Sequence, residues 1–144
     1  MGMTRARKKR TRGMAMVEMI FVLPLLLILV FGIAEFGLMF SRWLTLSNAV
    51  REGARNGTNY RVSPSGNQCP GKKSAIENEV KNTVVEYANA GGVPINTGDV
   101  NVTGICDPSG DPVEVSASYD FKVNIPFASL NTIPIAYKSK MRNE

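Results

Sequence analysis

The stretch MAMVEMIFVLPLLLILVFGIAEFGLMF, residues 14–40, decides how this chain folds. Glu18 and Glu35 are its only charged residues, and the 16 residues between them carry no charge. A helix that crosses a membrane needs about 20 largely apolar residues. Because apolar side chains would occupy every side of this helix, the sequence predicts a membrane span and not an amphipathic surface helix.

A cluster of basic residues precedes this stretch. Residues 1–13 contain six Lys or Arg and no acid, whereas the other 131 residues carry 11 basic and 12 acidic side chains. The overall charge of +5 is therefore a property of this leader. A basic run can also indicate nucleic-acid binding, but beside a hydrophobic stretch it favours orientation, with Lys and Arg on the cytoplasmic side. We expect a cytoplasmic N-terminus, a single membrane pass and no nucleic-acid partner.

The end of the apolar run argues against an ordinary cleaved signal peptide. Such a peptide has a shorter apolar core that ends in small residues in an A-x-A pattern. Here the run ends in GIAEFGLMF, residues 32–40, which offers no such site. Arg42 and Trp43 follow, and both suit the outer membrane interface.

The rest of the chain is predicted to be a small α+β domain outside the membrane. The membrane helix should continue to about residue 55, so that residues 14–55 form one extended helix. Residues 56–144 would then fold into a domain that is too small to bury a large core.

A second amphipathic helix is predicted in this domain. Ser74 and Glu77 have the spacing of a capping box at its start, and Gly91 with Gly92 should end it. Alternating apolar residues predict one strand near position 100, a long strand over 113–125 and a third over 133–138. Together these strands would make a small antiparallel sheet.

Cys69 and Cys106 are the two cysteines of the chain. If the leader stays in the cytoplasm both lie outside the membrane, where disulfides persist. A bond between them would stabilise the domain by about 4 kcal/mol through loop closure, and two buried free thiols are the alternative. No metal site is expected, because there is no histidine and only two thiols are present.

The junction between leader and apolar run holds the most informative residues. An acid in the first turns of a membrane helix is costly, so Glu18 is a functional candidate by default. If the chain were cut after Gly13, Glu18 would become the fifth residue, and Met14 would carry a new amine. The alternative is that Glu18 lies at the membrane edge without a partner.

The segment RGMAMVEMIFVLPLLLILVFGIAEFG, residues 12–37, resembles type IV pilins and pseudopilins, whose leaders end in glycine and whose mature chains have glutamate fifth. More narrowly, it resembles the TadE-like family of the tight-adherence (Flp) pilus system. VREGAR at residues 50–55 and the MRNE ending also fit. Type II secretion pseudopilins usually have Phe-Thr-Leu-Ile-Glu after the glycine, and major Flp pilins are usually shorter, so the resemblance indicates a minor pilin or pseudopilin.

The resemblance implies processing by a prepilin peptidase between Gly13 and Met14. It also implies an inner-membrane protein with a periplasmic C-terminal domain, surrounded by membrane lipid and recruited by an assembly platform. Other pilin and pseudopilin subunits would be its partners in an extracellular pilus, in assembly and adhesion. Glu18 of one subunit would pair with the Met14 amine of a neighbour. The alternative is an uncleaved single-pass protein with a small periplasmic binding domain.

Two further residues stand out within the apolar run. Pro24 removes one backbone donor and frees the Ile20 carbonyl, which predicts a kink or a local opening of the helix. Glu35 lies roughly 26 Å beyond Glu18 along a helix, near the opposite interface. It is either an interfacial acid without a partner or a contact of Arg42, in its own or another chain.

Enzyme chemistry is not expected from this sequence. The chain has no histidine, no pair of carboxylates at a recognisable spacing and no Gly-rich phosphate-binding loop with Lys and Ser or Thr. We therefore predict no catalytic residues and no cofactor, and expect a structural protein.

Overall fold

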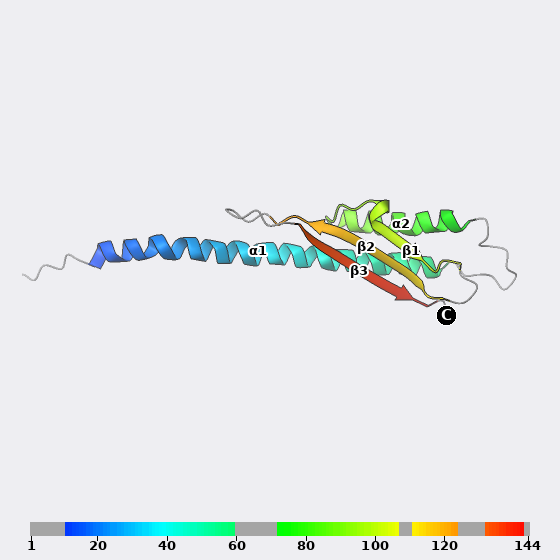
Figure 1. The fold of residues 1–144 in the computed structure, drawn as a ribbon, viewed down its shortest axis with the longest axis horizontal. Helices are drawn as coiled ribbons and strands as arrows, with labels where there is room; N and C mark the ends of the chain where they lie inside the picture. Colours follow the sequence, from blue (N-terminus) through cyan, green and yellow to red (C-terminus); the bar gives the residue numbers. More distant parts are fainter. Residues whose placement is uncertain (1–10, 60–71, 107–110, 124–131, 143–144) are drawn as a thin grey trace, which may run out of the picture.

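The computed structural model describes residues 11–59, 72–106, 111–123 and 132–142. Within these residues two α-helices, one short 3-10 helix and three strands follow one another along the chain (Figure 1). The predicted α+β class, with a long N-terminal helix, a second helix and a small antiparallel sheet, is confirmed. The elements are α1 (Thr11–Thr58), α2 (Lys73–Ala90), η1 (Thr97–Asp99), β1 (Val100–Thr103), β2 (Val113–Phe121) and β3 (Ile133–Met141).

Helix α1 is the longest element of the molecule. It has 48 residues and a length of roughly 72 Å. It extends three residues beyond each end of the predicted helix at 14–55. Its N-terminal half projects away from the domain, and its C-terminal half lies against α2 and the sheet (Figure 1).

Helix α2 confirms the predicted amphipathic face and corrects the predicted cap. The apolar residues at four-residue spacing are buried. The helix begins at Lys73 with Lys72 as its N-cap, and no side chain caps it, so the expected capping box of Ser74 and Glu77 is wrong. Ser74 is already inside the first helical turn, whereas a capping residue must have non-helical backbone angles. The buried residues are Ile76, Val80, Val84 and Ala88.

The three strands form an antiparallel sheet in the order β1-β2-β3. Strand β2 ends at Phe121, earlier than predicted, and Val123 is already outside it; residue 125 lies outside the described residues. Phe121 pairs with Ile133, the first residue of β3, so the described ladder offers no backbone partner beyond this pair. At the other end Val113 pairs with Met141, and β3 is accordingly longer than the predicted 133–138.

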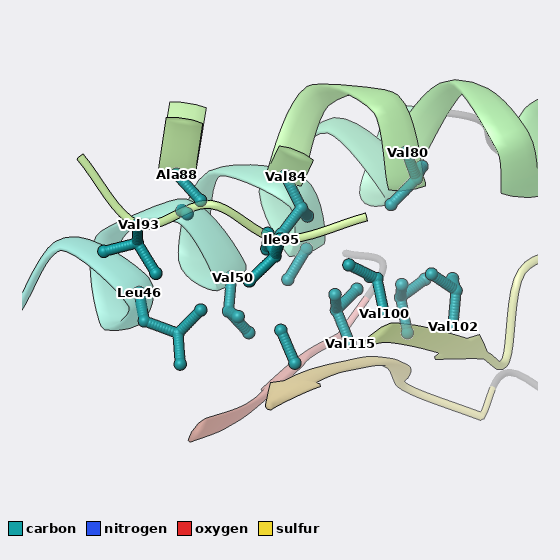
Figure 2. Packing of buried hydrophobic residues seen from close by; sticks show 14 of the residues in the cluster. Leu46, Val50, Val80, Val84, Ala88, Val93, Ile95, Val100, Val102 and Val115 are labelled. Atoms are coloured by element: carbon teal, nitrogen blue, oxygen red, sulfur yellow. The ribbon is translucent and has the colours of Figure 1, made fainter. Parts of the chain in front are cut away.

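The core lies between the sheet and the two helices. Leu46 and Val50 of α1, Val84 of α2 and Val100 and Val115 of the sheet meet there (Figure 2). Helix α1 lies under β2 and β3, while α2 lies under β1. The last turns of the long helix are therefore part of the domain core and not a tether to it.

The outer face of the sheet carries a small ion-pair network. The carboxylate of Glu114 on β2 contacts Lys138 and Lys140 of the neighbouring strand, with 2.8 Å between its Oε2 and Lys140 Nζ. These lysines hold the pKa of the Glu114 carboxyl below its usual value, because both of them donate hydrogen bonds to the charged form.

This network predicts a pH dependence of stability. A depressed carboxyl pKa stabilises the fold above the unfolded-state pKa of about 4.3, and the contribution is lost as the pH falls through the lower folded-state value. We therefore expect Glu114→Gln to lower the thermal midpoint of the detergent-solubilised chain at neutral pH. The difference from wild type should shrink as the pH falls below about 4. A difference that stays constant down to the acid limit would contradict this assignment.

Candidate membrane and assembly segment

The junction residues all lie on the exposed first turns of α1. Gly13 has open space where a side chain would be, and Met14 is 80% exposed. Glu18 is also exposed and makes no ion pair or hydrogen bond within the described part of the chain. Residues four apart share one face of a helix, so Met14 and Glu18 lie one above the other. The predicted roles of these residues in processing and assembly stay predictions.

Most of the apolar half of α1 is uncovered by the other described residues. Met39 is half-buried against the domain. The other large side chains between Met14 and Phe40 are exposed, and those that are exposed least still expose more than two fifths of their surface. By length and composition this is the one helix in the described residues that could cross a membrane, and none of its most apolar window is buried. The core helix of a soluble protein would be mostly buried. The exposed surface therefore fits a membrane-anchored protein, because such an area in water is strongly unfavourable.

Helix α1 continues through Pro24. The membrane environment tolerates proline in a helix, because neighbouring groups can satisfy the freed backbone carbonyl. The predicted kink at this position stays a prediction.

Arg42 joins the apolar helix to the sheet. Its Nη1 donates a hydrogen bond of 3.1 Å to the hydroxyl of Tyr119. Its guanidinium carbon also lies 4.9 Å from the ring centroid of Phe121. Such a cation–π contact contributes about 0.5–2 kcal/mol, depending on how dry it is. Arg42 was predicted from the sequence as an interfacial residue, but its two aromatic partners were not predicted.

A second set of contacts follows along the same side of α1. Arg51 donates hydrogen bonds of 3.1 and 2.9 Å from Nε and Nη2 to the hydroxyl of Tyr137 on β3. The ring of Tyr137 also meets Trp43 edge to face, with 6.1 Å between ring centroids, and Trp43 stacks on Phe40 at 5.9 Å. Strand β3 is thus fixed to α1 through Tyr137, which contacts Trp43 and Arg51 of the helix.

Glu35 lies where α1 passes the end of the sheet, and its expected place at the outer interface stays a prediction. It is half-buried beside the end of the sheet, in a shallow hollow that it shares with Phe36, Met39 and Ile133. In the described residues it makes no ion pair or hydrogen bond, so the expected contact with Arg42 of its own chain is not made. Arg42 instead points toward the aromatic residues of β2.

The VREGAR segment has a clear packing function. Val50 and Ala54 are fully buried, and a Cβ placed on Gly53 would collide with the Cγ2 atom of Val84 on α2. Glu52 and Arg55 form an exposed ion pair of 2.9 Å. Glycine at position 53 therefore permits the close approach of the two helices, a role that the sequence analysis did not assign.

Cys106 is described and Cys69 is not. Cys106 follows β1 with a left-handed backbone conformation, φ 58°, and no cysteine in the described residues is free. Because Cys69 lies outside the described residues, the disulfide between the two stays a prediction. Among the described side chains no group of three or more His, Cys, Asp or Glu is arranged to hold a metal ion.

Comparison with known protein families finds a match in the first part of the chain. Residues 13–55 match the family model of TadE-like proteins, a family associated with tight-adherence pilus systems. The match covers less than a third of the chain and begins at the predicted cleavage junction. The family resemblance stated from the sequence is thereby confirmed for this segment, and it favours a structural, non-enzymatic protein. No curated protein and no solved structure matches the chain.

Proposed function

We propose that this chain, with its TadE-like segment, is a minor pilin or pseudopilin of a tight-adherence pilus that takes part in pilus assembly and adhesion. The observation that carries the proposal is the division of α1 into two halves. One half is apolar and mostly exposed, and the other is part of the domain core. A subunit of this shape can pass from a membrane into a filament without refolding of its domain, because lipid and neighbouring helices cover the same apolar surface.

The N-terminal leader fits a processing signal. In the proposal, residues 1–13 stay in the cytoplasm and a prepilin peptidase cuts between Gly13 and Met14. Gly13 lets the backbone approach an active site closely, since it has no side chain and open space around it. A local opening of α1 at this point is required, and that opening has a low free-energy cost because no other described element packs on the first turns of the helix.

The remaining chain would be a single-pass inner-membrane protein until assembly. Residues 14–55 would form the membrane and filament helix, and residues 56–144 the periplasmic domain. Pilin and pseudopilin subunits and an inner-membrane assembly platform are its proposed partners. Pro24 would act as a weak point that lets the helix extend during assembly, since it lacks one backbone hydrogen bond.

Glu18 has a specific role in this proposal. Cleavage creates an amine on Met14, one helical turn before Glu18. In a filament the helices pack in a core shielded from water, where an unpaired charge is costly. Glu18 of one subunit would neutralise the Met14 amine of its neighbour, and the pairing would also set the axial register between subunits.

The first experiment measures the intact mass and N-terminal residue of the membrane-extracted protein, with and without a prepilin peptidase. We expect a peptidase-dependent loss of residues 1–13 and a mature chain that starts at Met14. Gly13→Leu is the matched variant, and it should remain full length under both conditions. A wild-type chain that remains full length with the peptidase present would favour the uncleaved single-pass protein instead.

A further inference from the structure

One end of the sheet lies beside the outer part of the apolar helix. Phe121 and Ile133 form the last described pair of the β2–β3 ladder. Together with Val123 they line a hollow whose other wall is α1 between Gly32 and Met39. In Figure 1 this end of β2 and the start of β3 point toward the projecting half of α1.

The depth of this sheet end in a membrane can be estimated from the turns of α1 that lie beside it. A hydrocarbon core of about 30 Å takes about 20 helical residues, which residues 14–33 supply. Residues 34–43 then pass through the interface, where Arg42 and Trp43 are favoured. The hollow runs beside residues 32–39, which lie roughly 5–15 Å before Arg42 along the helix, so the sheet end lies within the interface and reaches toward the boundary between headgroups and acyl chains.

The exposed chemistry of the sheet end suits that level. Ile133 is 42% exposed and Phe36 across the hollow is 64% exposed, so exposed apolar side chains lie on both walls of the hollow that Glu35 also lines. Lys122, beside Val123, is exposed at the same end. Apolar side chains next to a basic one are typical of protein surfaces that rest in a lipid interface.

We propose that the exposed surface of this sheet end, formed by Lys122, Val123 and Ile133, rests in the outer-leaflet interface of the membrane with lipid as its occupant. The inference rests on the proposed membrane segment and adds a second point of contact. Glu35, half-buried in the hollow, then lies at headgroup level and not in the hydrocarbon core. The membrane helix and the sheet end then both hold the domain against the bilayer. When the subunit enters a filament, another protein surface must replace the lipid on the apolar sheet end.

The test uses single tryptophans in the full chain, in a Trp43→Phe background. The chain is reconstituted at high lipid-to-protein ratio into phosphatidylcholine vesicles with brominated acyl chains, which quench tryptophan on contact. Ile133→Trp probes the sheet end. Thr103→Trp, exposed at the opposite end of the sheet, is the matched control, and Leu26→Trp reports on the membrane helix. Circular dichroism and the thermal midpoint verify that each variant folds.

We expect Ile133→Trp to be quenched several-fold more strongly than Thr103→Trp and to emit at shorter wavelength. Equal, weak quenching of these two variants, with strong quenching of Leu26→Trp, would overturn the sheet-end contact while leaving the anchor in place. A blue-shifted Ile133→Trp without bromine quenching would mean that protein covers the site, which also overturns it. Absence of quenching at Leu26→Trp would overturn the membrane anchor itself.

Discussion

Glu18→Ala is expected to leave cleavage after Gly13 intact and to reduce incorporation of the subunit into pili by about a hundredfold or more. The peptidase acts on the Gly13–Met14 bond, four residues before the substituted side chain. In the filament, however, the variant would leave the Met14 amine unpaired among apolar helices. Removal of one partner from a buried charge pair costs about 3–5 kcal/mol, and each 1.4 kcal/mol is about tenfold in an equilibrium.

Two variants make this experiment specific. Glu18→Asp keeps the charge and should retain a large part of the incorporation. Glu35→Gln removes the other acid of the same apolar run, and in our interpretation it should have a much smaller effect. The measurement is the ratio of subunit in sheared pili to subunit in the membrane fraction, with N-terminal sequencing to verify cleavage. Wild-type incorporation of Glu18→Ala would disprove the pairing.

Gly53→Leu is expected to destabilise the domain by about 3 kcal/mol. Even a Cβ at this position overlaps the Val84 side chain, and a β-branched valine has little rotational freedom to move away. Overpacking of a well-packed core typically costs about 1–3 kcal/mol, and occasionally more. A leucine would push α1 and α2 apart along the whole contact that includes Val50 and Ala54. In a small domain this is a large fraction of the total stability.

The matched control is Gly37→Leu in the same helix. No atom lies within 4 Å of a Cβ built there. Gly37→Leu therefore brings the same gain in helix propensity as Gly53→Leu, but no clash. Urea unfolding of the detergent-solubilised full chain, followed by circular dichroism, gives both free energies. If Gly53→Leu were as stable as Gly37→Leu, the close contact between the helices would be wrong.

The local pattern of the sequence was sufficient for most of the secondary structure. The four-residue spacing of apolar residues predicted the buried face of α2, and alternation predicted the inward residues of β2. The prediction failed where an element's end depends on a partner. Strand β2 ends at Phe121 because β3 begins opposite it, and Ser74 does not cap α2 because the helix begins one residue before it.

The candidate site was predictable in one part and not in the other. Gly13, Met14 and Glu18 lie within six residues, so their relation could be derived from the sequence and the family resemblance. The hydrogen bonds of Arg42 to Tyr119 and of Arg51 to Tyr137 join residues 77 and 86 positions apart. No local sequence pattern indicates either pair. Partners so far apart in the sequence depend on which strand packs against which turn of α1.

The sequence by itself determined that this chain has an apolar helix with a basic leader, an acid near its start and an α+β domain after it. These features follow from composition and periodicity, which need no knowledge of distant contacts. Only the tertiary structure decided how the domain sits on that helix. Close helix packing at Gly53 and the contacts of Arg42 and Arg51 bring the sheet down alongside α1. The end of the sheet therefore lies beside Glu35 and the outer apolar residues, because long-range packing and not local pattern sets that register.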